Sequence, residues 1–252
     1  MKTTFIVTSA LVTDIGVFDL TTRLQQTHQT LDSIYAKFPD ANVLLVDGGK
    51  TELKTTQHPL LESLKDRVGA FLDLTDDDQI THLHSIPTNH KRELGGIAGL
   101  VKSMAEMTIF QQALLTLRDY EQIAALKDVD RIFKVTGRYQ LSPLFNPEVY
   151  RVTKGKYAFK ERTPSWIPNP LETVGTDHCF QSRCWSFDVS LLDEVIDKYD
   201  RMMEDLQALS DENRYIDIEH LLYKHIGPDN AIEFDYVHFM GTIGPNGTMI
   251  YD

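Results

Sequence analysis

The most informative feature of the sequence is a lysine inside an apolar segment. In RIFKVTGRYQL (131–141), Lys134 lies among residues typical of a buried strand. Because an unpaired buried ammonium costs several kcal/mol, Lys134 needs an acidic partner or an anionic ligand. Directly after the strand, Gly137 allows close approach of a ligand, Arg138 offers a planar fork for a diphosphate, and Tyr139 can stack on a base or a sugar. The alternative is a salt bridge from Lys134 to an aspartate, with Arg138 at the surface.

A carboxylate ends a second apolar segment. Asp47 closes NVLLVD (42–47) and directly precedes Gly48. At the end of a parallel strand such a carboxylate can bind the ribose or base of a nucleotide. Aspartate is also a common first residue of a turn, so both interpretations stay open.

The segment IDIEH (216–220) contains a third group of reactive side chains. Asp217 and His220 are three residues apart and share one face of a helix, whereas Glu219 points elsewhere. A carboxylate here could act as a general base on an acceptor hydroxyl. The alternative is acidic charge at a helix start, favoured by the helix dipole.

Other polar segments are less specific. His238 precedes a glycine-rich loop in YVHFMGTIGPNGT (236–248), which suits either closure over a phosphate or a hairpin turn. HKRELGG (90–96) suits an anion at a helix start or a solvated first turn. HLH (82–84) and DLTDDD (73–78) could bind a metal, but neither has tight ligand spacing.

The periodicity of the chain predicts how these residues are positioned. Apolar strands alternate with amphipathic helices in the first half, which indicates a parallel sheet, and the second half is more mixed. The strands are expected at 4–8, 42–47, 80–86, 130–136, 149–160 and 182–188, with a further apolar run at 68–72, and the helices at 21–38, 57–67, 92–118, 189–207 and 214–226. We expect one α/β domain over 1–252, with ligands at the carboxyl ends of the strands, next to Thr8 and Ser9, Asp47 and Gly48, and Thr136 to Tyr139.

The composition of the chain and the motifs that it lacks argue against several classes of function. The net charge of −12 disfavours general nucleic-acid binding, which needs many phosphate-neutralising cations. GxGxxG and GxxxxGK[ST] are absent, so the dinucleotide and P-loop fingerprints are missing. Two cysteines without an export signal or a membrane-length apolar run predict free thiols and a cytoplasmic location.

The order of these segments resembles glycosyltransferases of the GT-A fold, particularly small bacterial, phage and large-virus members with a K-[IV]-[ST]-G-R-Y segment. The resemblance rests on a first strand ending in TS, then RLQQT-x-x-TLDSI, LLVDGG, a long helix, FKVTGRYQL, WSFD and IEHLLY. It implies a Rossmann-like nucleotide-binding half (1–140) and an acceptor-binding half (141–252). The implied substrates are a nucleoside-diphosphate-sugar donor and a glycan or other hydroxyl-bearing acceptor.

The resemblance also implies roles for individual residues. Thr8, Ser9, Arg23 and Asp47 would lie around the nucleotide. Glu219 would be the catalytic base if the enzyme inverts, with Asp217 as the second choice.

One departure from the family concerns the metal. GT-A enzymes usually carry an Asp-x-Asp that binds a divalent metal such as Mn²⁺ or Mg²⁺, but here the corresponding segment is KVTGRY. Lys134 and Arg138 could replace the metal, since fixed cations stabilise a leaving diphosphate. Alternatively, metal ligands come from elsewhere, such as residues 76–78 or His238; we favour the first interpretation.

Two other functions remain open. A nucleotidyltransferase acting on sugar phosphates usually has a basic, glycine-rich loop after strand one, whereas this chain has SALVTDIG there. A non-catalytic nucleotide- or carbohydrate-binding protein of the same fold would explain the missing Asp-x-Asp.

Overall fold

The computed structural model describes residues 1–87, 96–119, 129–212, 214–243 and 246–252. A seven-stranded sheet runs through these residues in the order β3-β2-β1-β4-β9-β6-β10. Its strands are β1 (Thr3–Ser9), β2 (Asn42–Asp47), β3 (Ala70–Asp73), β4 (Arg131–Thr136), β6 (Tyr157–Lys160), β9 (Cys184–Asp188) and β10 (Ala231–Phe234). Neighbouring strands pair in parallel except at β9, which is antiparallel to β4 and β6. The predicted α/β class with a mostly parallel central sheet and a mixed second half is confirmed.

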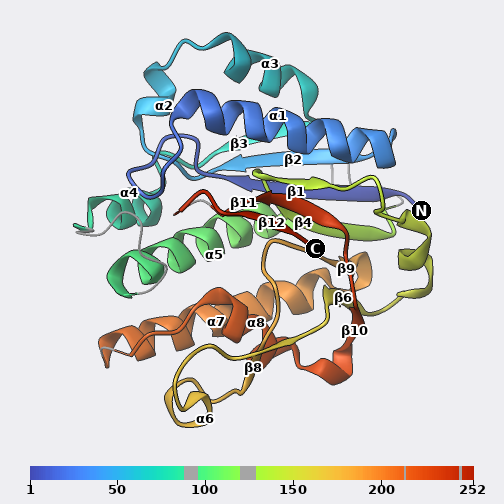
Figure 1. Ribbon diagram of the computed structural model, residues 1–252. Coiled ribbons are helices and arrows are strands. Elements are labelled where there is room, and N and C mark those ends of the chain that lie inside the picture. The colour runs from blue at the N-terminus through green and yellow to red at the C-terminus, as the bar shows by residue number, and fades with distance from the viewer. Residues whose placement is uncertain (88–95, 120–128, 213, 244–245) are drawn as a thin grey trace.

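Helices cover both faces of the sheet, as Figure 1 shows. The helices are α1 (Leu20–Lys37), α2 (Glu52–Thr55), α3 (Pro59–Arg67), α4 (Asp78–Ser85), α5 (Gly96–Asp119), α6 (Pro170–Thr173), α7 (Leu192–Asp211) and α8 (Ile218–Ile226), with 3₁₀ turns at Pro147–Val152, Val189–Leu191 and Pro228–Asn230. Helices α1 and α3 pack on one face, and α5, α7 and α8 pack on the other. None of these described helices has both the length and the apolar character needed to span a bilayer.

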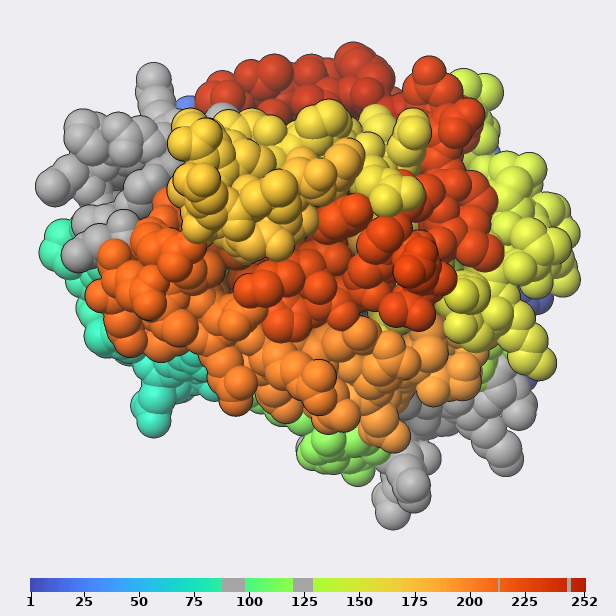
Figure 2. All heavy atoms as spheres, turned by 90° about the horizontal axis from the view of Figure 1, so that it is seen from below, coloured from blue at the N-terminus to red at the C-terminus, as the bar shows by residue number. Residues whose placement is uncertain are grey.

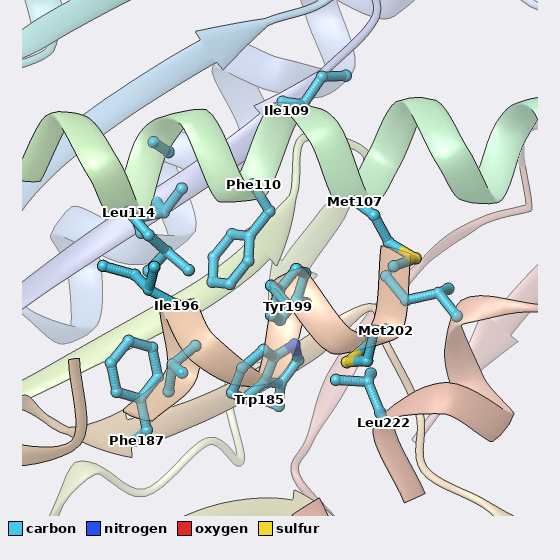
Figure 3. Close-up of a cluster of buried hydrophobic side chains, with 14 of the residues drawn as sticks. Met107, Ile109, Phe110, Leu114, Trp185, Phe187, Ile196, Tyr199, Met202 and Leu222 are labelled. Carbon is cyan, nitrogen blue, oxygen red and sulfur yellow. The ribbon is translucent and has the colours of Figure 1, made fainter. Parts of the chain in front are cut away.

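The buried strands supply two cores because successive side chains point to opposite faces. In β1, Phe5 and Val7 pack toward α1, whereas Ile6 packs toward α5. On the α5 face, the ring of Phe110 lies 5.0 Å from that of Tyr199 and 5.6 Å from that of Trp185 (Figure 3). The sheet is thereby fixed between two apolar layers.

Two small sheets complete the second half. Strands β5 (Tyr139–Leu141), β11 (Phe239–Thr242) and β12 (Met249–Tyr251) form one, and β7 (Thr163–Pro164) with β8 (His178–Cys179) forms the other. Since β5 follows β4 after a two-residue turn, the three-stranded sheet adjoins the carboxyl edge of the main sheet.

Several predicted elements need correction. Residues 80–86, predicted as a strand, belong largely to helix α4, because Asp77 accepts hydrogen bonds from the backbone N–H groups of Gln79 and Ile80. Residues 149–152, at the start of the strand predicted at 149–160, belong to a 3₁₀ turn (Pro147–Val152) that is capped by Asn146. The helix predicted from residue 214 begins at Ile218, where Asp217 is the N-cap.

Candidate active site

A pocket opens where β1, β2 and β4 end. The strands are parallel, so their carboxyl ends meet at one edge of the sheet. The pocket lining includes seven of the residues singled out from the sequence, namely Thr8, Ser9, Arg23, Gly48, His84, Thr136 and Arg138. Helix α5 adds Lys102 and Glu106, which sequence reasoning missed. The remaining predicted residues lie beneath this pocket or away from it.

Asp47 ties the ends of β1 and β2 together. Its carboxylate accepts hydrogen bonds from Ser9 Oγ (2.6 Å) and from the backbone N–H groups of Leu11 (2.8 Å) and Gly49 (2.9 Å). Burial raises the pKa of Asp47, although the three donors favour the charged form. Asp47 therefore shapes the pocket wall by fixing two loops, and its carboxylate is occupied by internal donors.

Arg23 organises the loop after β1. Its guanidinium donates to the carbonyl oxygens of Phe18 (3.2 Å), Ala10 (3.0 Å) and Ile15 (2.9 Å). Burial, together with the charge of Arg138, lowers the pKa of Arg23 to about 10, so it remains a cation at neutral pH. Arg23 thus adds positive charge at the pocket as well as holding its rim.

Lys134 has an acidic partner, and that partner is a glutamate. Its ammonium forms an ion pair with Glu106 and also donates to Thr136 Oγ1 (2.9 Å) and the carbonyl of Ser182 (2.7 Å). Burial opposes ionisation of Glu106, but Lys134, Lys102 and Arg138 together lower its pKa to about 2. The charge of Lys134 is therefore balanced inside the protein beneath the pocket.

Two polar atoms at the pocket lack partners among the residues that the structure describes. Thr8 Oγ1 and Arg138 Nε are both buried and make no hydrogen bond there. Thr8 is 3% exposed, and both residues line the pocket. Buried polar groups are nearly always satisfied, so these two atoms are available to a water molecule or to a polar atom of a ligand. Arg138 is half-buried, which differs from the surface position considered as an alternative.

The two predicted glycines are sites of close packing. A Cβ at Gly48 would overlap the side chain of Ile109 on α5. A Cβ at Gly137 would lie 3.3 Å from Thr27 Oγ1, and the Gly137 N–H donates to the carbonyl of Thr8 (2.8 Å). At both positions glycine lets the pocket wall approach a neighbouring element.

The structure does not bring Tyr139 or His238 into the pocket lining. Tyr139 is 2% exposed, with the guanidinium of Arg183 over its ring. His238 stacks on Tyr236 and precedes β11 at the end that pairs with Leu141, away from the pocket. His238 is a non-glycine residue with a φ of 59°. Because neither residue lines the pocket, neither ring can stack on a nucleotide base bound there.

Glu219 and Asp217 form a second acidic cluster at the start of α8. Ser182 Oγ donates to Glu219 Oε1 (2.7 Å), and the carbonyl of Ser182 accepts from Lys134, so one residue connects this cluster to the pocket floor. Burial and the charge of Asp217 raise the pKa of Glu219. Asp217 Oδ1 accepts from His220 Nδ1 (2.6 Å) and from the backbone N–H of His220 (3.1 Å).

The metal ligands considered from the sequence are not gathered at the pocket in the described part of the chain. The residues that the structure describes contain no group of three or more His, Cys, Asp or Glu side chains placed to hold an ion. Of the alternative ligands, Asp76 pairs with Lys54, and Asp77 caps α4. HKRELGG lies outside the described residues except for its last glycine.

The glycine-rich tail loop packs on the loop after β1. A Cβ at Gly247 would lie 3.4 Å from Val17 and 3.7 Å from Phe18. The Gly247 N–H donates to the carbonyl of Ile243 (2.8 Å), which gives the turn geometry considered as an alternative. Gly244 and Pro245 lie outside the described residues.

Glu106 and Lys102 could have been identified from the sequence. They are the only charged residues between positions 96 and 117, in a helix that is otherwise apolar or neutral. Charges four apart on one helix lie on the same face, so a paired functional role could have been predicted.

Comparisons with known proteins give structural similarities alone. No family model matches the chain, and no curated protein matches it. The galactosyltransferase LgtC, in complex with donor and acceptor sugar analogs, is similar with a TM-score of 0.49 and 12% identity over 92% of this chain and 73% of LgtC. An active-site mutant of LgtC gives a TM-score of 0.47 and 11% identity over 92% and 72% of the two chains. A glycosyltransferase involved in glycosylating the major capsid of PBCV-1 gives 0.43 and 10% over 93% and 82%. At TM-scores below 0.5, these similarities carry no argument about what this chain does.

Proposed function

We propose that this chain is a GT-A-fold glycosyltransferase that moves a sugar from a nucleoside-diphosphate-sugar donor to an acceptor hydroxyl. The observation that carries the proposal is the pocket at the carboxyl edge, where Arg23, Lys102 and Arg138 converge and where Thr8 Oγ1 and Arg138 Nε have no partner among the described residues. In a chain with a net charge of −12, such local positive charge suits a small anion.

The diphosphate of the donor matches this pocket. A guanidinium binds phosphate oxygens through two parallel N–H donors, and a fixed ammonium adds a point charge. We assign the stabilisation of the leaving diphosphate to Arg138 and Lys102, because Lys134 is committed to Glu106. The residues of the pocket lining lie between positions 8 and 138, which supports the assignment of residues 1–140 to nucleotide binding.

Glu219 is the proposed catalytic base of the acceptor half (141–252). The acceptor oxygen attacks the anomeric carbon and the bond to the diphosphate breaks. The hydroxyl proton passes to the carboxylate of Glu219, and the configuration inverts. A raised pKa makes Glu219 a stronger base than an exposed glutamate, which suits proton abstraction near neutral pH. Asp217 is the second choice, since two hydrogen bonds from His220 already engage its carboxylate.

Calorimetry tests the donor assignment. Wild-type protein and two variants, Arg138→Gln and Arg151→Gln, are titrated with UDP, GDP, CDP and dTDP. We expect one nucleotide to bind the wild type and the Arg151→Gln control, whose arginine is exposed and paired with Glu148. Arg138→Gln should weaken that binding at least about tenfold, the effect of one charge-assisted contact. Absence of binding by all four at millimolar concentration would count against a nucleotide-sugar donor.

One observation keeps a non-catalytic binding protein as the second candidate. The described residues offer no cluster of metal-binding carboxylates at the pocket. Glu219→Gln separates the two functions, because an enzyme loses turnover and keeps donor affinity, whereas a binder has no turnover to lose. We also propose a cytoplasmic location, which the two unpaired buried cysteines support.

A further inference from the structure

A serine, a histidine and an aspartate form a continuous hydrogen-bonded chain outside the pocket. Asp217 Oδ1 lies 2.6 Å from His220 Nδ1, and His220 Nε2 lies 2.7 Å from Ser165 Oγ. The three side chains come from two segments of the chain, the loop after β7 and the start of α8, so the fold brings them together. Figure 2 shows residues of the 160–180 segment, in yellow, beside the orange-red surface of α8.

The hydrogen-bond partners determine which atoms of Asp217, His220 and Ser165 carry the protons. An ionised carboxylate only accepts, so Nδ1 of His220 donates to Asp217. In neutral imidazole the other nitrogen then has no proton, and Nε2 accepts the hydroxyl proton of Ser165. This is the arrangement in which a histidine can remove a proton from a serine while an aspartate fixes its tautomer.

Asp217 and His220, at one end of this hydrogen-bonded relay, are buried, whereas Ser165 at the other end is partly exposed. His220 is completely buried and Asp217 is 4% exposed, so water does not compete for their hydrogen bond. The ring of Trp166 meets that of His220 edge to face, with centroids 4.8 Å apart. Ser165 itself is partly exposed, and Trp166 beside it is 57% exposed. Ser165 therefore lies at the protein surface beside an exposed apolar side chain.

We propose that Ser165 is the nucleophile of a second catalytic site, which transfers acyl groups from activated esters. Ser165 Oγ bonds to the acyl carbon, and its proton moves to His220 Nε2. The bond from that carbon to the alcohol oxygen breaks, and the leaving oxygen takes the proton from His220. Water then attacks the acyl-serine through the same relay and releases the carboxylic acid, so that the net reaction is ester hydrolysis.

The surroundings of Ser165 restrict the class of ester. The backbone N–H of Ile167 donates to Ser165 Oγ (3.1 Å), which is the nucleophilic oxygen and not the position of an oxyanion. The described contacts assign no donor to an oxyanion beside Ser165, and the loss of one such donor slows acyl transfer about 10²–10³-fold in enzymes. We therefore expect aryl esters, whose leaving groups need little stabilisation, and an acyl or aryl group that packs against Trp166.

The test uses the full chain, a fluorophosphonate probe and p-nitrophenyl acetate. We expect one probe molecule on Ser165, located by peptide mass spectrometry, and a matching loss of esterase activity. Ser165→Ala should lower the labelling rate at least about 100-fold, since removal of a triad serine abolishes the covalent route. Ser85→Ala is the control, because Ser85 is a serine whose hydroxyl donates to a backbone carbonyl rather than to a histidine nitrogen.

His220→Asn distinguishes an activated serine from an accessible one. We expect it to lose labelling as Ser165→Ala does, with circular dichroism confirming the fold. Where that variant does not fold, denatured wild-type protein decides, because labelling through the relay requires the folded arrangement of Ser165, His220 and Asp217. An unlabelled wild type, labelling at another residue, labelling unchanged by a folded His220→Asn, or equal labelling of native and denatured protein would each overturn the proposal.

Discussion

The ammonium of Lys134 and the carboxylate of Glu106 form an ion pair beneath the carboxyl-edge pocket, with side chains 0% and 14% exposed. The pair joins β4 to α5, two elements on which the pocket depends. The mid-strand lysine is thus part of the scaffold, and the charge available to a ligand comes from neighbouring residues.

The first prediction concerns this pair. Glu106→Gln leaves a buried ammonium without its counter-charge and should lower the free energy of unfolding by about 3–5 kcal/mol. The double variant Glu106→Gln/Lys134→Met should lose less than the sum of the two single losses, because it removes both charges. Chemical denaturation of the wild type, Glu106→Gln, Lys134→Met and the double variant measures these losses. Lys54→Met is the control, since its pair with Asp76 is exposed and is screened by solvent.

A second prediction follows from the lowered pKa of Glu106. An acid whose pKa is lower in the folded state stabilises the protein above its unfolded value of 4.5, and this stabilisation is lost as pH falls toward about 2. The wild type should therefore lose about 3 kcal/mol from this group across that interval. Unfolding measured from pH 5 to pH 2 should show a shallower slope for Glu106→Gln. Equal slopes would mean that Glu106 is not ionised by its neighbours.

The third prediction concerns the contact between Gly48 and Ile109. Gly48→Ala places a methyl group against Ile109 and should lower the free energy of unfolding by about 1–3 kcal/mol, as overpacking does. Ile109→Ala makes room for that methyl, so the double variant should be more stable than the sum of the single losses predicts. Additive losses would show that α5 does not approach β2 closely at this point.

The sequence predicted the elements whose signals are local. The first βαβ unit is visible because apolar runs at 4–8 and 42–47 flank an amphipathic helix, and the structure pairs these strands in parallel. Residues 80–86 were misassigned because Ile80 and Leu83, both buried, follow helical spacing only once the cap at Asp77 is recognised. Thr8, Gly48 and Arg138 lie at or just after the ends of strands, and for that reason the sequence predicted that they are close together. The structure places all three in the lining of one pocket.

The sequence did not predict which residues far apart in the chain contact one another. Nothing local says which of 37 acidic residues meets Lys134, because Glu106 is brought to it by packing of α5 on the sheet. The role of Asp47 depends similarly on the loop after β1, whose Leu11 N–H supplies one of its three donors. His238 was linked to the site by its neighbouring glycines, whereas the register of β11 on β5 places it at the other end.

The fourth prediction concerns the two cysteines. Burial raises the pKa of Cys179 to about 11 and that of Cys184 to about 12, so almost no thiolate is present at pH 8. Ellman's reagent should react slowly with the native protein and should titrate two thiols once denaturant is added. Fast reaction of one thiol in the native state would contradict the burial of that side chain.

The fifth prediction uses the raised pKa of Glu219. A base acts only when ionised, so turnover should fall as pH drops through a midpoint above 4.5, the usual value for glutamate. An acid with a raised pKa in the folded state stabilises the protein at low pH, and that contribution is lost as pH rises through the raised value. Glu219→Gln should therefore abolish turnover and also be more stable, relative to wild type, at pH 8 than at pH 4.

The two readouts of Glu219→Gln are independent. Glutamine keeps an oxygen that can accept the Ser182 hydroxyl proton, so the variant removes the charge and preserves the contact. A variant that gains relative stability at pH 8 but retains turnover would place the catalytic base elsewhere, with Asp217 tested next. A variant that loses turnover without the pH-dependent gain would mean that the carboxylate is solvated in the folded protein, because only a desolvated charge is relieved by neutralisation.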